Sequence, residues 1–457
     1  MKALVLGLDC AAPALLFDRY ADDLPVLSAL RRRGAWGAMQ SCDPPITVPA
    51  WTVMASSQDP GRLGIYGFRH RKPSTYTEGY TVSSTSITVP RIWDYLGQRG
   101  KNVIVVGVPP SYPPRPVRGC LVSCFMTPDG RPWTYPASLG EELRGLVGRY
   151  KADVLFRKDD RDRVLAETVD MTEQHFAILK QLLKTKPWDL AWFVEIGLDR
   201  IHHAFWKFFD PTHPGYVPGN KYERVGLEYY RLLDSRIGEI LSLLNDQTAV
   251  LVISDHGAKA MRGAFCVNQW LAREGHLAFH EEPSTPIPLE QAPIDWSRTR
   301  AWGWGGYYAR IFLNVRGREP SGVIASEDYE RERDRLAASL AAVCDPSGRV
   351  MDTRVFKPER LYPVRRGDPP DLLVYFDDLS WRSAGTVGHP DMYLSENDTG
   401  PDDAVHDYDG IFILHDPRRA SGGHGRLDIL DVAPTVLTLM DEPVPPAMQG
   451  RPSEVVG

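Results

Sequence analysis

The chain has 457 residues, with 53 Lys and Arg against 59 Asp and Glu, and a formal net charge of −6 at pH 7. This length suits one large α/β domain with insertions, or two domains. Both signs of charge are interspersed, which excludes a basic field for wrapping nucleic acid but still allows a local basic pocket for an anionic substrate.

We expect neither a membrane span nor a signal peptide from the sequence pattern. No apolar run approaches the length of a membrane helix, and the opening MKALVLGLD is too short and ends too acidic for a signal peptide. The six cysteines are scattered without a CxxC pair, which suits reduced thiols better than a disulfide framework. We expect a cytoplasmic protein with no membrane association, and the sequence does not indicate its oligomeric state.

Short apolar runs of β-forming residues recur along the chain, with amphipathic segments between them. In one such segment, residues 223–244, the apolar side chains share one helical face. A final helix is expected near LDVAPTVLTLM, with Pro434 in its first turn. The alternation predicts an α/β fold with a mostly parallel sheet and helices on both faces. Buried parallel strands are predicted at residues 3–8, 103–106, 190–194, 249–253 and 411–414.

Two stretches interrupt this alternation. One is PPSYPPRP, whose prolines are incompatible with regular structure. The other is rich in Pro, Arg and Trp and reads EEPSTPIPLEQAPIDWSRTRAWGWGGYY. We predict an insertion at residues 108–187 and an inserted cap or lid subdomain at 265–399. The catalytic core would then consist of residues 1–107, 188–264 and 400–457.

Polar residues follow several of the predicted strands. In open α/β sheets the ligand site lies beyond the carboxyl ends of the strands, so these residues are candidates for a site. Carboxylates mixed with imidazoles are the ligands favoured by zinc, and by manganese or iron in sites richer in oxygen. The candidates are Asp9 after ALVLGL, Asp199 and His203 after LAWFVEIGL, Asp255 and His256 after AVLVIS, and His406 before GIFIL.

Each of these residues also has a purely structural interpretation. Asp9 can cap a helix, and Asp-His-Gly after a strand is commonly a turn. His406 can be a surface histidine, and His202 competes with His203 for the position one turn after Asp199. The shared position at strand ends favours a metal site, because independent capping would not require it.

Thr47 lies in a Pro-bounded turn before a predicted helix. It is either an N-cap or a nucleophile. Ligation to a divalent cation can deprotonate a hydroxyl at neutral pH, and a helix N-terminus stabilises an incoming anion.

Six motifs in order make the chain resemble the alkaline phosphatase superfamily, specifically its type I phosphodiesterase/nucleotide pyrophosphatase branch. They are LGLD, TVPAW with DPGRLGIYGF, GLDRIHHAFW, SDHG, DDAVHDYDGIFIL, and LDVAPTVLTLM with PPAMQGRP. The resemblance implies an alkaline phosphatase-like fold and a hydrolase of small phosphate esters, possibly of nucleotides.

The resemblance also implies two divalent cations, usually zinc, with manganese as the alternative. One cation would be bound by Asp9, Thr47, Asp255 and His256, and the other by Asp199, His203 and His406. The family's spacing selects His203 over His202, and its last histidine precedes a strand like GIFIL, which selects His406 over His424. Thr47 would attack phosphorus and form a phosphothreonine, which water then hydrolyses, with overall retention of configuration at phosphorus.

The chain departs from this family at two positions. Phe68 replaces an Asn that binds a phosphoryl oxygen, and Leu63 replaces a His. Arg69 and Arg71, on either side of His70, are candidate substitutes for the phosphate clamp, since a guanidinium forks onto phosphate oxygens, although a basic tripeptide is also typical of a solvated loop.

The aromatic residues of the predicted lid have two interpretations. They stack on a nucleobase or another flat leaving group, or they pack in a core. The residues are Trp302, Trp304, Tyr307 and Tyr308.

Other functions use the same ligand set. A phosphomonoesterase and a metal-dependent phosphoglycerate mutase remain alternatives, and so does a catalytically silent binding protein. A sulfatase is disfavoured because Cys42 begins CDPPI, with Ile46 where C-x-P-x-R has its arginine.

Overall fold

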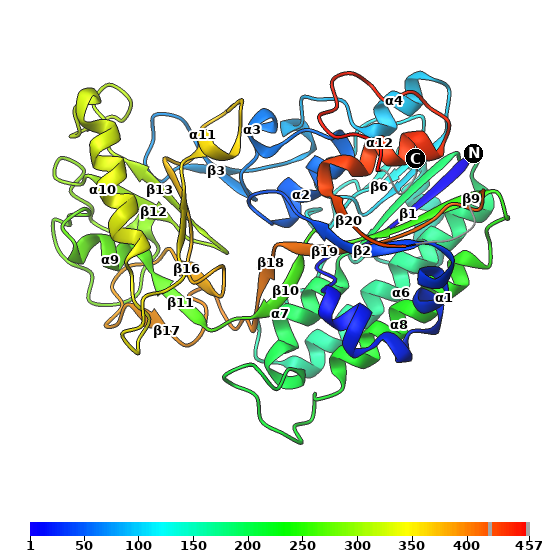
Figure 1. The fold of residues 1–457 in the computed structure, drawn as a ribbon, viewed down its shortest axis with the longest axis horizontal. Coiled ribbons are helices and arrows are strands. Elements are labelled where there is room, and N and C mark those ends of the chain that lie inside the picture. The colour runs from blue at the N-terminus through cyan, green and yellow to red at the C-terminus, as the bar shows by residue number, and fades with distance from the viewer. Residues whose placement is uncertain (419–422, 454–457) are drawn as a thin grey trace.

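The computed structural model describes residues 1–418 and 423–453 and has two lobes (Figure 1). The larger lobe is built around a nine-stranded sheet. Its strands are β1 (Lys2–Leu8), β2 (Ala35–Gln40), β5 (Val103–Val106), β6 (Gly119–Val122), β7 (Thr134–Tyr135), β8 (Leu190–Glu195), β9 (Thr248–Ile253), β19 (Asp409–His415) and β20 (His424–Asp428).

The strand order is β20-β2-β19-β9-β1-β8-β5-β6-β7. Five adjacent strands form a parallel block in the order β9-β1-β8-β5-β6. At one edge of the sheet, β2 runs parallel to β20. The predicted α/β class with a mostly parallel sheet is therefore confirmed. One predicted direction was wrong: β19, expected to be parallel, runs antiparallel to both β9 and β2. A short apolar run reveals burial but not strand direction.

Helices cover both faces of this sheet, because its strands are apolar on both sides. In β1, Leu4, Leu6 and Leu8 enter one core cluster, and Ala3 and Val5 enter the other. The first cluster is covered by α1 (Pro25–Arg33), α5 (Ala137–Val147), α6 (Arg161–Thr185), α7 (Gly197–Phe209) and α8 (Val225–Leu241). The second is covered by α2 (Thr47–Ser56), α4 (Ile92–Gln98) and α12 (Val432–Leu439).

The segment 108–187 is part of the core and not a separate insertion, which corrects the prediction. Strands β6 and β7 extend the central sheet, and α6 buries residues such as Phe176 and Leu179 in the first core cluster. The Pro-rich PPSYPPRP is only the link between β5 and β6.

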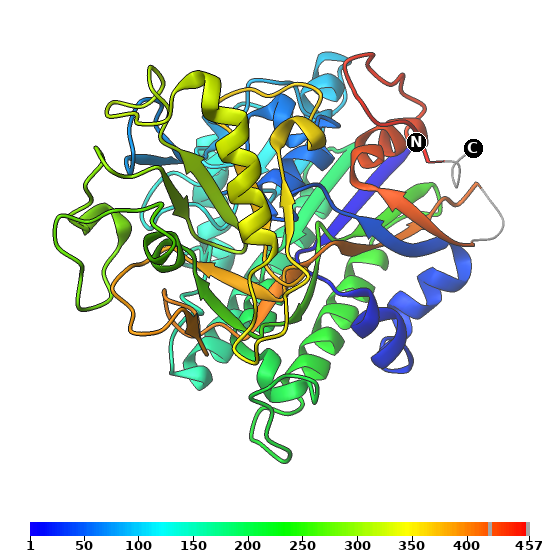
Figure 2. The ribbon, with the colours of Figure 1, turned by 60° about the vertical axis from the view of Figure 1, so that its left-hand side comes forward.

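The smaller lobe has its own hydrophobic cluster, which includes Phe265, Trp302 and Leu372. Its elements run from β11 to β17, and Figure 2 shows the lobe in front of the central sheet. Its four-stranded sheet has the order β12-β13-β15-β14, and a three-stranded sheet has the order β16-β11-β17. The elements are β11 (Gly263–Cys266), α9 (Val267–Arg273), β12 (Ala301–Trp304), β13 (Ala309–Leu313), α10 (Tyr329–Ala341), β14 (Arg354–Phe356), α11 (Pro358–Leu361), β15 (Leu372–Tyr375), β16 (Trp381–Ala384) and β17 (Tyr393–Leu394).

Two small β-ribbons lie between the lobes. One pairs β10 (Gly257–Ala260) with β18 (Ala404–Asp407), and the other pairs β3 (Arg69–Arg71) with β4 (Gly79–Thr81). The remaining elements are α3 (Pro60–Leu63) and the single turns at Ala14–Arg19, Ala21–Asp23, Ser84–Ser86, Leu289–Gln291, Ser326–Asp328 and Ile429–Asp431.

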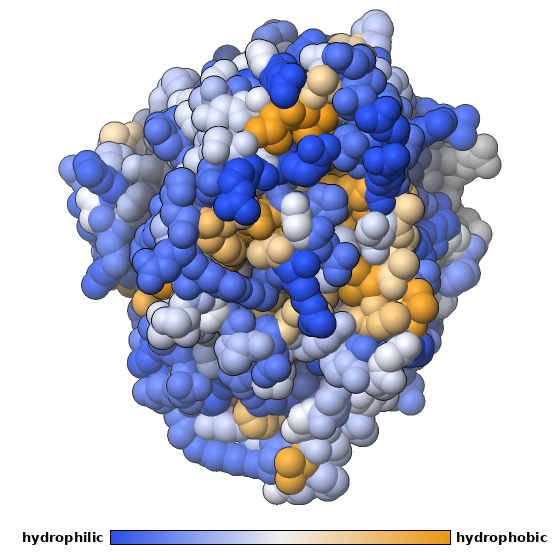
Figure 3. Space-filling model, turned by 90° about the vertical axis from the view of Figure 1, so that its left-hand side faces the viewer, coloured by the Kyte–Doolittle hydropathy of each residue, from blue (hydrophilic) through white to orange (hydrophobic). Residues whose placement is uncertain are grey.

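The surface, the cysteines and the helix composition add three observations. On the outer face of the smaller lobe, apolar residues lie in separate groups between hydrophilic ones (Figure 3). All six cysteines carry free thiols. Among the described residues, no helix combines the length and the apolar composition needed to cross a membrane.

Gly7 marks the closest approach between β1 and the side chain of Trp51 from α2. A Cβ added at Gly7 would lie 2.4 Å from Cη2 of Trp51 and 2.8 Å from Cγ2 of Val194. We expect Gly7→Ala to lower the free energy of unfolding by about 1–3 kcal/mol, because buried neighbours must shift. Denaturant titration measures this value.

The matched control is Gly145→Ala in α5, where an added Cβ meets no atom within 4 Å. Its free energy of unfolding should stay constant or rise by up to about 1 kcal/mol, since alanine favours a helix. An equal loss in both variants would contradict the packing argument.

Candidate metal centre and active site

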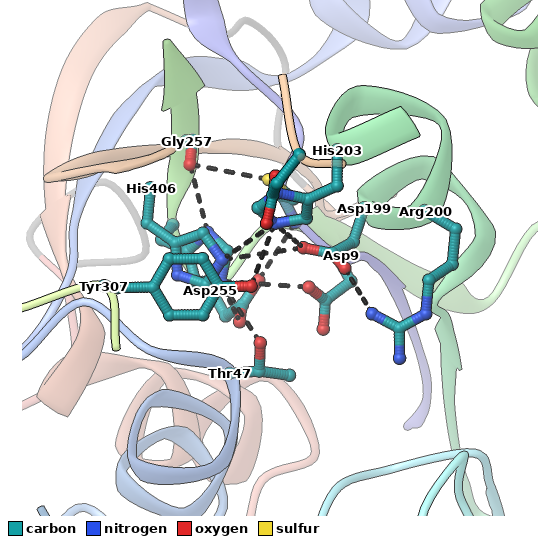
Figure 4. Close-up of polar contacts among 12 residues, drawn as sticks. Asp9, Thr47, Asp199, Arg200, His203, Asp255, Gly257, Tyr307 and His406 are labelled. Carbon is teal, nitrogen blue, oxygen red and sulfur yellow. Dashed lines mark hydrogen bonds and ion pairs between the residues drawn. The ribbon is translucent and has the colours of Figure 1, made fainter. Parts of the chain in front are cut away.

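The structure brings the seven candidate site residues together between the sheet and the smaller lobe (Figure 4). Asp9 follows β1, Asp255 and His256 follow β9, and Asp199 and His203 lie on α7, which begins after β8. His406 comes from β18, and Thr47 is the first residue of α2. All seven side chains are buried. The carboxyl ends of neighbouring strands therefore deliver these groups to one place, as the strand-end pattern predicted.

The first group of potential ligands contains Asp9, Asp255 and His256. Nε2 of His256 lies 3.1 Å from Oδ2 of Asp255, 3.8 Å from Oδ1 of Asp9 and 3.4 Å from Oγ1 of Thr47. Atoms bound tetrahedrally at about 2.0–2.1 Å from one zinc ion are roughly 3.3 Å apart, so these separations fit a shared cation.

The second group contains Asp199, His203, His406 and also Cys10. Nε2 of His203 lies 3.2 Å from Oδ1 of Asp199 and 3.2 Å from Nε2 of His406. Oδ1 of Asp199 lies 3.6 Å from Nε2 of His406. Two unprotonated imidazole nitrogens repel each other at this distance. A cation bound between them removes this repulsion, because both nitrogens then donate their lone pairs to it.

The Nδ1 atom of each of the three histidines is already engaged. In His256 it donates to the Gly257 carbonyl at 3.0 Å, and in His406 it donates to the Pro45 carbonyl at 2.9 Å. In His203 it lies 2.7 Å from Oδ1 of Asp402. Hydrogen bonds of this kind fix the tautomer and leave the Nε2 lone pair free for a metal.

The carboxylates have oxygens without hydrogen-bond partners. Oδ1 of Asp9, Oδ1 of Asp199 and Oδ2 of Asp255 are buried and accept no hydrogen bond in the structure. Their other oxygens are occupied: Trp51 Nε1 donates to Asp9 at 2.7 Å, and the Cys10 N–H donates to Asp255 at 3.1 Å. Buried oxygens of this kind are costly unless a cation binds them, so the residues fit a site for two cations.

Burial and neighbouring carboxylates shift the pKa values of Asp9 and His256. Burial and the carboxylates of Asp255 and Asp199 raise the pKa of Asp9 well above its usual value. Burial opposes protonation of His256, but Asp255 and Asp9 raise its pKa to about 9. Protons would therefore compete with metal for this cluster, since metal ligands bind in their deprotonated forms.

Thr47 is not the N-cap of α2. That position belongs to Ile46, and no side chain caps the helix. The hydroxyl points towards the ligand cluster, as Figure 4 shows, and lies 3.4 Å from Nε2 of His256. The structural alternative for Thr47 therefore does not apply, and its Oγ1 is placed beside the first group of ligands.

The structure separates the competing histidines. His202 packs against Trp206, Phe209 and Tyr230, and burial lowers its pKa to about 3, as expected for a neutral core histidine. His424 is exposed on β20 and lies against Trp36. Neither belongs to the two candidate groups of ligands.

A pocket of about 560 Å³ adjoins the centre, which is an ordinary size for a small-molecule site. Trp304 and Tyr307 line it, and Tyr307 stacks on His406 with ring centroids 3.8 Å apart. Tyr308 also lines the pocket, although most of its side chain is buried. Trp302 is buried in the core of the smaller lobe. The four aromatic residues therefore divide between the two interpretations that the sequence left open.

The two candidate arginines also differ. Arg69 lines the pocket. Arg71 is buried and fully engaged: its guanidinium binds Asp368 through two hydrogen bonds of 2.7 and 2.8 Å and Glu319 at 2.7 Å. Arg71 therefore holds the hairpin to the smaller lobe and is not available to a substrate, which corrects its prediction as a substrate contact.

The sequence reasoning missed several residues around the ligands. Trp51 and Asp402 orient Asp9 and His203, and the Tyr307 hydroxyl lies 3.2 Å from Nε2 of His203. Cys10 follows Asp9 directly and has a positive φ of 68°, a conformation that is uncommon outside glycine. Only the motif DDAVHDYDG, which contains Asp402 four residues before His406, carried a local signal for one of them.

Comparisons with known proteins were made for both sequence and structure. The family model described as type I phosphodiesterase / nucleotide pyrophosphatase matches residues 3–409. No curated protein matches the chain significantly. Phosphonoacetate hydrolase from Sinorhizobium meliloti 1021, in complex with phosphonoformate, has a similar structure, with a TM-score of 0.64 and 18% identity over 96% of each chain.

Two further structures are ectonucleotide pyrophosphatase / phosphodiesterase 5 from human and mouse. The human protein has a TM-score of 0.58 and 14% identity, with 99% of this chain and 97% of that chain covered. An inactive murine form in complex with AMP has a TM-score of 0.57 and 14% identity over the same shares. At these identities the structures show a common fold.

His406→Ala should remove one of two bound cations, because it deletes a ligand of the second group. Metal content after zinc or manganese loading and desalting, read by elemental mass spectrometry, measures this. His424→Ala is the matched control and should keep both cations. Loss of metal in the His424 variant alone would contradict the assignment.

Trp51→Phe should weaken metal binding by about 10–100-fold, since the Nε1 donor that orients Asp9 is lost. Competition with a chromophoric chelator measures the affinity. Trp93→Phe is the control: Trp93 lies in the same core cluster, but its Nε1 has no hydrogen-bond partner. Equal affinities in the two variants would show that this hydrogen bond does not support the site.

Proposed function

The chain belongs to the type I phosphodiesterase/nucleotide pyrophosphatase family, and from this premise we propose that it hydrolyses small phosphodiesters or pyrophosphates with Thr47 as the attacking group. The family consists of metal-dependent phosphoester hydrolases of the alkaline phosphatase superfamily. Two buried groups of potential metal ligands meet in this chain.

The position of the Thr47 hydroxyl is the observation that carries this proposal. It is buried at the first residue of α2 and faces the ligand cluster, 3.4 Å from Nε2 of His256. The N–H groups of the first helical turn lie at the same end, where they favour a negatively charged phosphoryl group. A structural role as a helix cap is absent, so the hydroxyl is free for chemistry.

Divalent cations, when bound, lower the pKa of a coordinated hydroxyl and offset negative charge on phosphoryl oxygens. Asp9, Asp255 and His256 would hold one cation beside Thr47, and Asp199, His203 and His406 would hold the other. Oγ1 of Thr47 forms a bond to phosphorus while the bond to the leaving oxygen breaks. Water then hydrolyses the phosphothreonine. Two successive displacements retain the configuration at phosphorus.

We propose zinc as the cation, with manganese as the alternative. The support is the ligand chemistry: three imidazole nitrogens and three carboxylates suit borderline transition metals better than calcium or magnesium.

The size of the pocket and the ligands bound in similar structures both support a small substrate. Those structures contain phosphonoformate and AMP. In this chain Ile46 and Phe68 line the pocket near Thr47. Phe68 stands where the family has an Asn side chain, so this part of the wall is apolar. A diester, whose second substituent can contact that wall, fits it better than a bare phosphate.

Thr47→Ala should lower turnover of bis-p-nitrophenyl phosphate by about a thousandfold or more, because the attacking atom is lost. Both cations should remain bound. Thr52→Ala, in the same helix, is the matched control, since its hydroxyl only donates to the Val48 carbonyl. Unchanged turnover in the Thr47 variant would dismiss Thr47 as the nucleophile.

A substrate panel tests the ester class. With each metal, wild-type protein should turn over bis-p-nitrophenyl phosphate faster than p-nitrophenyl phosphate, and it should cleave dinucleotides or pyrophosphates within the same panel. A higher kcat/KM for the monoester would reassign the chain as a phosphomonoesterase.

A further inference from the structure

The charge inside the pocket is unbalanced. Its lining contains five arginines but only two acidic residues, Glu290 and Asp398. The Asp398 side chain accepts hydrogen bonds from the Gly385 and Thr386 N–H groups, so it holds a loop. The arginines are Arg69, Arg157, Arg200, Arg310 and Arg382.

Three of the arginines have carboxylate partners within the protein. Arg200 binds Asp153 at 2.7 and 3.0 Å and also contacts Asp199. Arg157 and Arg382 both bind Oδ2 of Asp402, at 3.0 and 2.7 Å. These arginines belong to the support of the metal ligands, because Asp402 in turn holds His203.

Arg69 and Arg310 have no such partner. Among the described residues, neither guanidinium lies within ion-pair distance of a carboxylate: the one polar contact of Arg310 is Nη1 donating to the Arg69 carbonyl oxygen. A guanidinium has five N–H donors, so most of the donors of Arg310 are unused. The two residues come from β3 and β13, which places them on opposite sides of the junction between the lobes.

Arg310 is also partly withdrawn from water. It is half-buried, and its guanidinium lies over the Trp304 ring at 5.2 Å from the centroid. Burial lowers the pKa of Arg310, and the neighbouring Arg69 acts in the same direction. A partly desolvated cation beside a like charge is unfavourable unless a ligand supplies the opposite charge.

The same pocket adjoins the metal ligands through Tyr307, although the ligands themselves do not line it. Tyr307 lines it, and the Tyr307 hydroxyl lies 3.2 Å from Nε2 of His203. A molecule that binds through phosphorus at the centre can therefore extend past Tyr307 into the part of the pocket that Arg69 and Arg310 line.

We propose that Arg69 and Arg310 form a second anion-binding subsite, and that the substrates are phosphate esters or pyrophosphates with a further anionic group, a carboxylate or a phosphate, beyond the phosphorus that is attacked. The proposal rests on the proposed function for the position of that phosphorus. Two guanidinium groups in one pocket bind carboxylate and phosphate oxygens through charge-assisted hydrogen bonds.

Binding of analogues that cannot be hydrolysed tests the subsite without turnover. Calorimetric titration of metal-loaded wild-type protein would compare ω-phosphonoalkanoates longer than phosphonoacetate, in several chain lengths, with their ω-carboxamides, which differ only in the charge of the far end. Alkane bisphosphonates form the second arm and distinguish a distal phosphate from a distal carboxylate. We expect one anionic series to bind about tenfold tighter, or more, than the carboxamides.

Arg310→Gln and Arg69→Gln should each reduce this preference, and the double variant should abolish it. Arg316→Gln, an exposed arginine outside the pocket, is the matched control and should keep the wild-type preference. Equal affinities of the charged and uncharged analogues for wild type, or a preference that survives in the double variant, would overturn the proposal.

Hydrolysis of bis-p-nitrophenyl phosphate by wild type is measured in parallel. Inactive protein with an intact anion preference would refute the hydrolase and leave the subsite standing. Active protein without the preference would refute the subsite alone.

Discussion

The structure depends on one electrostatic constraint: three carboxylates and three imidazoles are buried together with no basic side chain among the ligands themselves. One oxygen of each carboxylate lacks a hydrogen bond, and the three Nε2 atoms face these oxygens. In a site of low dielectric constant such a cluster requires positive charge, which protonated His256, Arg200 beside Asp199, or bound cations can supply. The two candidate groups of ligands fit two cations, and the hydrogen bonds at Nδ1 leave the Nε2 atoms of the histidines available to them.

The fold satisfies the constraint through the parallel sheet. Adjacent strands β9, β1 and β8 end at the same edge, so residues far apart in sequence converge there without long loops. The surroundings are then built to hold them: Trp51 reaches Asp9 from α2, and Asp402 reaches His203 from the segment before β18. The smaller lobe completes the site by placing Tyr307 over His406 and by forming the far wall of the pocket.

The sequence predicted the features that depend on local pattern. Apolar runs indicated β1, β5, β8 and β9, and the polar residues directly after them indicated the ligands. It did not predict the antiparallel direction of β19. The direction and the order of strands in a sheet depend on contacts between segments that are distant in the sequence. The membership of 108–187 in the core was missed for the same reason. Arg69 and Arg71 look equivalent in sequence because residues two apart in a strand share a face. In the structure Arg69 lines the pocket, whereas Arg71 binds Glu319 and Asp368, and only the tertiary contacts make this difference. The supporting residues Trp51 and Tyr307 acquire their roles only through tertiary packing.

Anomalous diffraction from crystals of the zinc- or manganese-loaded protein tests the central claim most directly. The account predicts two anomalous peaks about 4 Å apart, one among Asp9, Asp255 and His256 and the other among Asp199, His203 and His406. A cluster without anomalous density, with the same side chains joined only by hydrogen bonds, would contradict it.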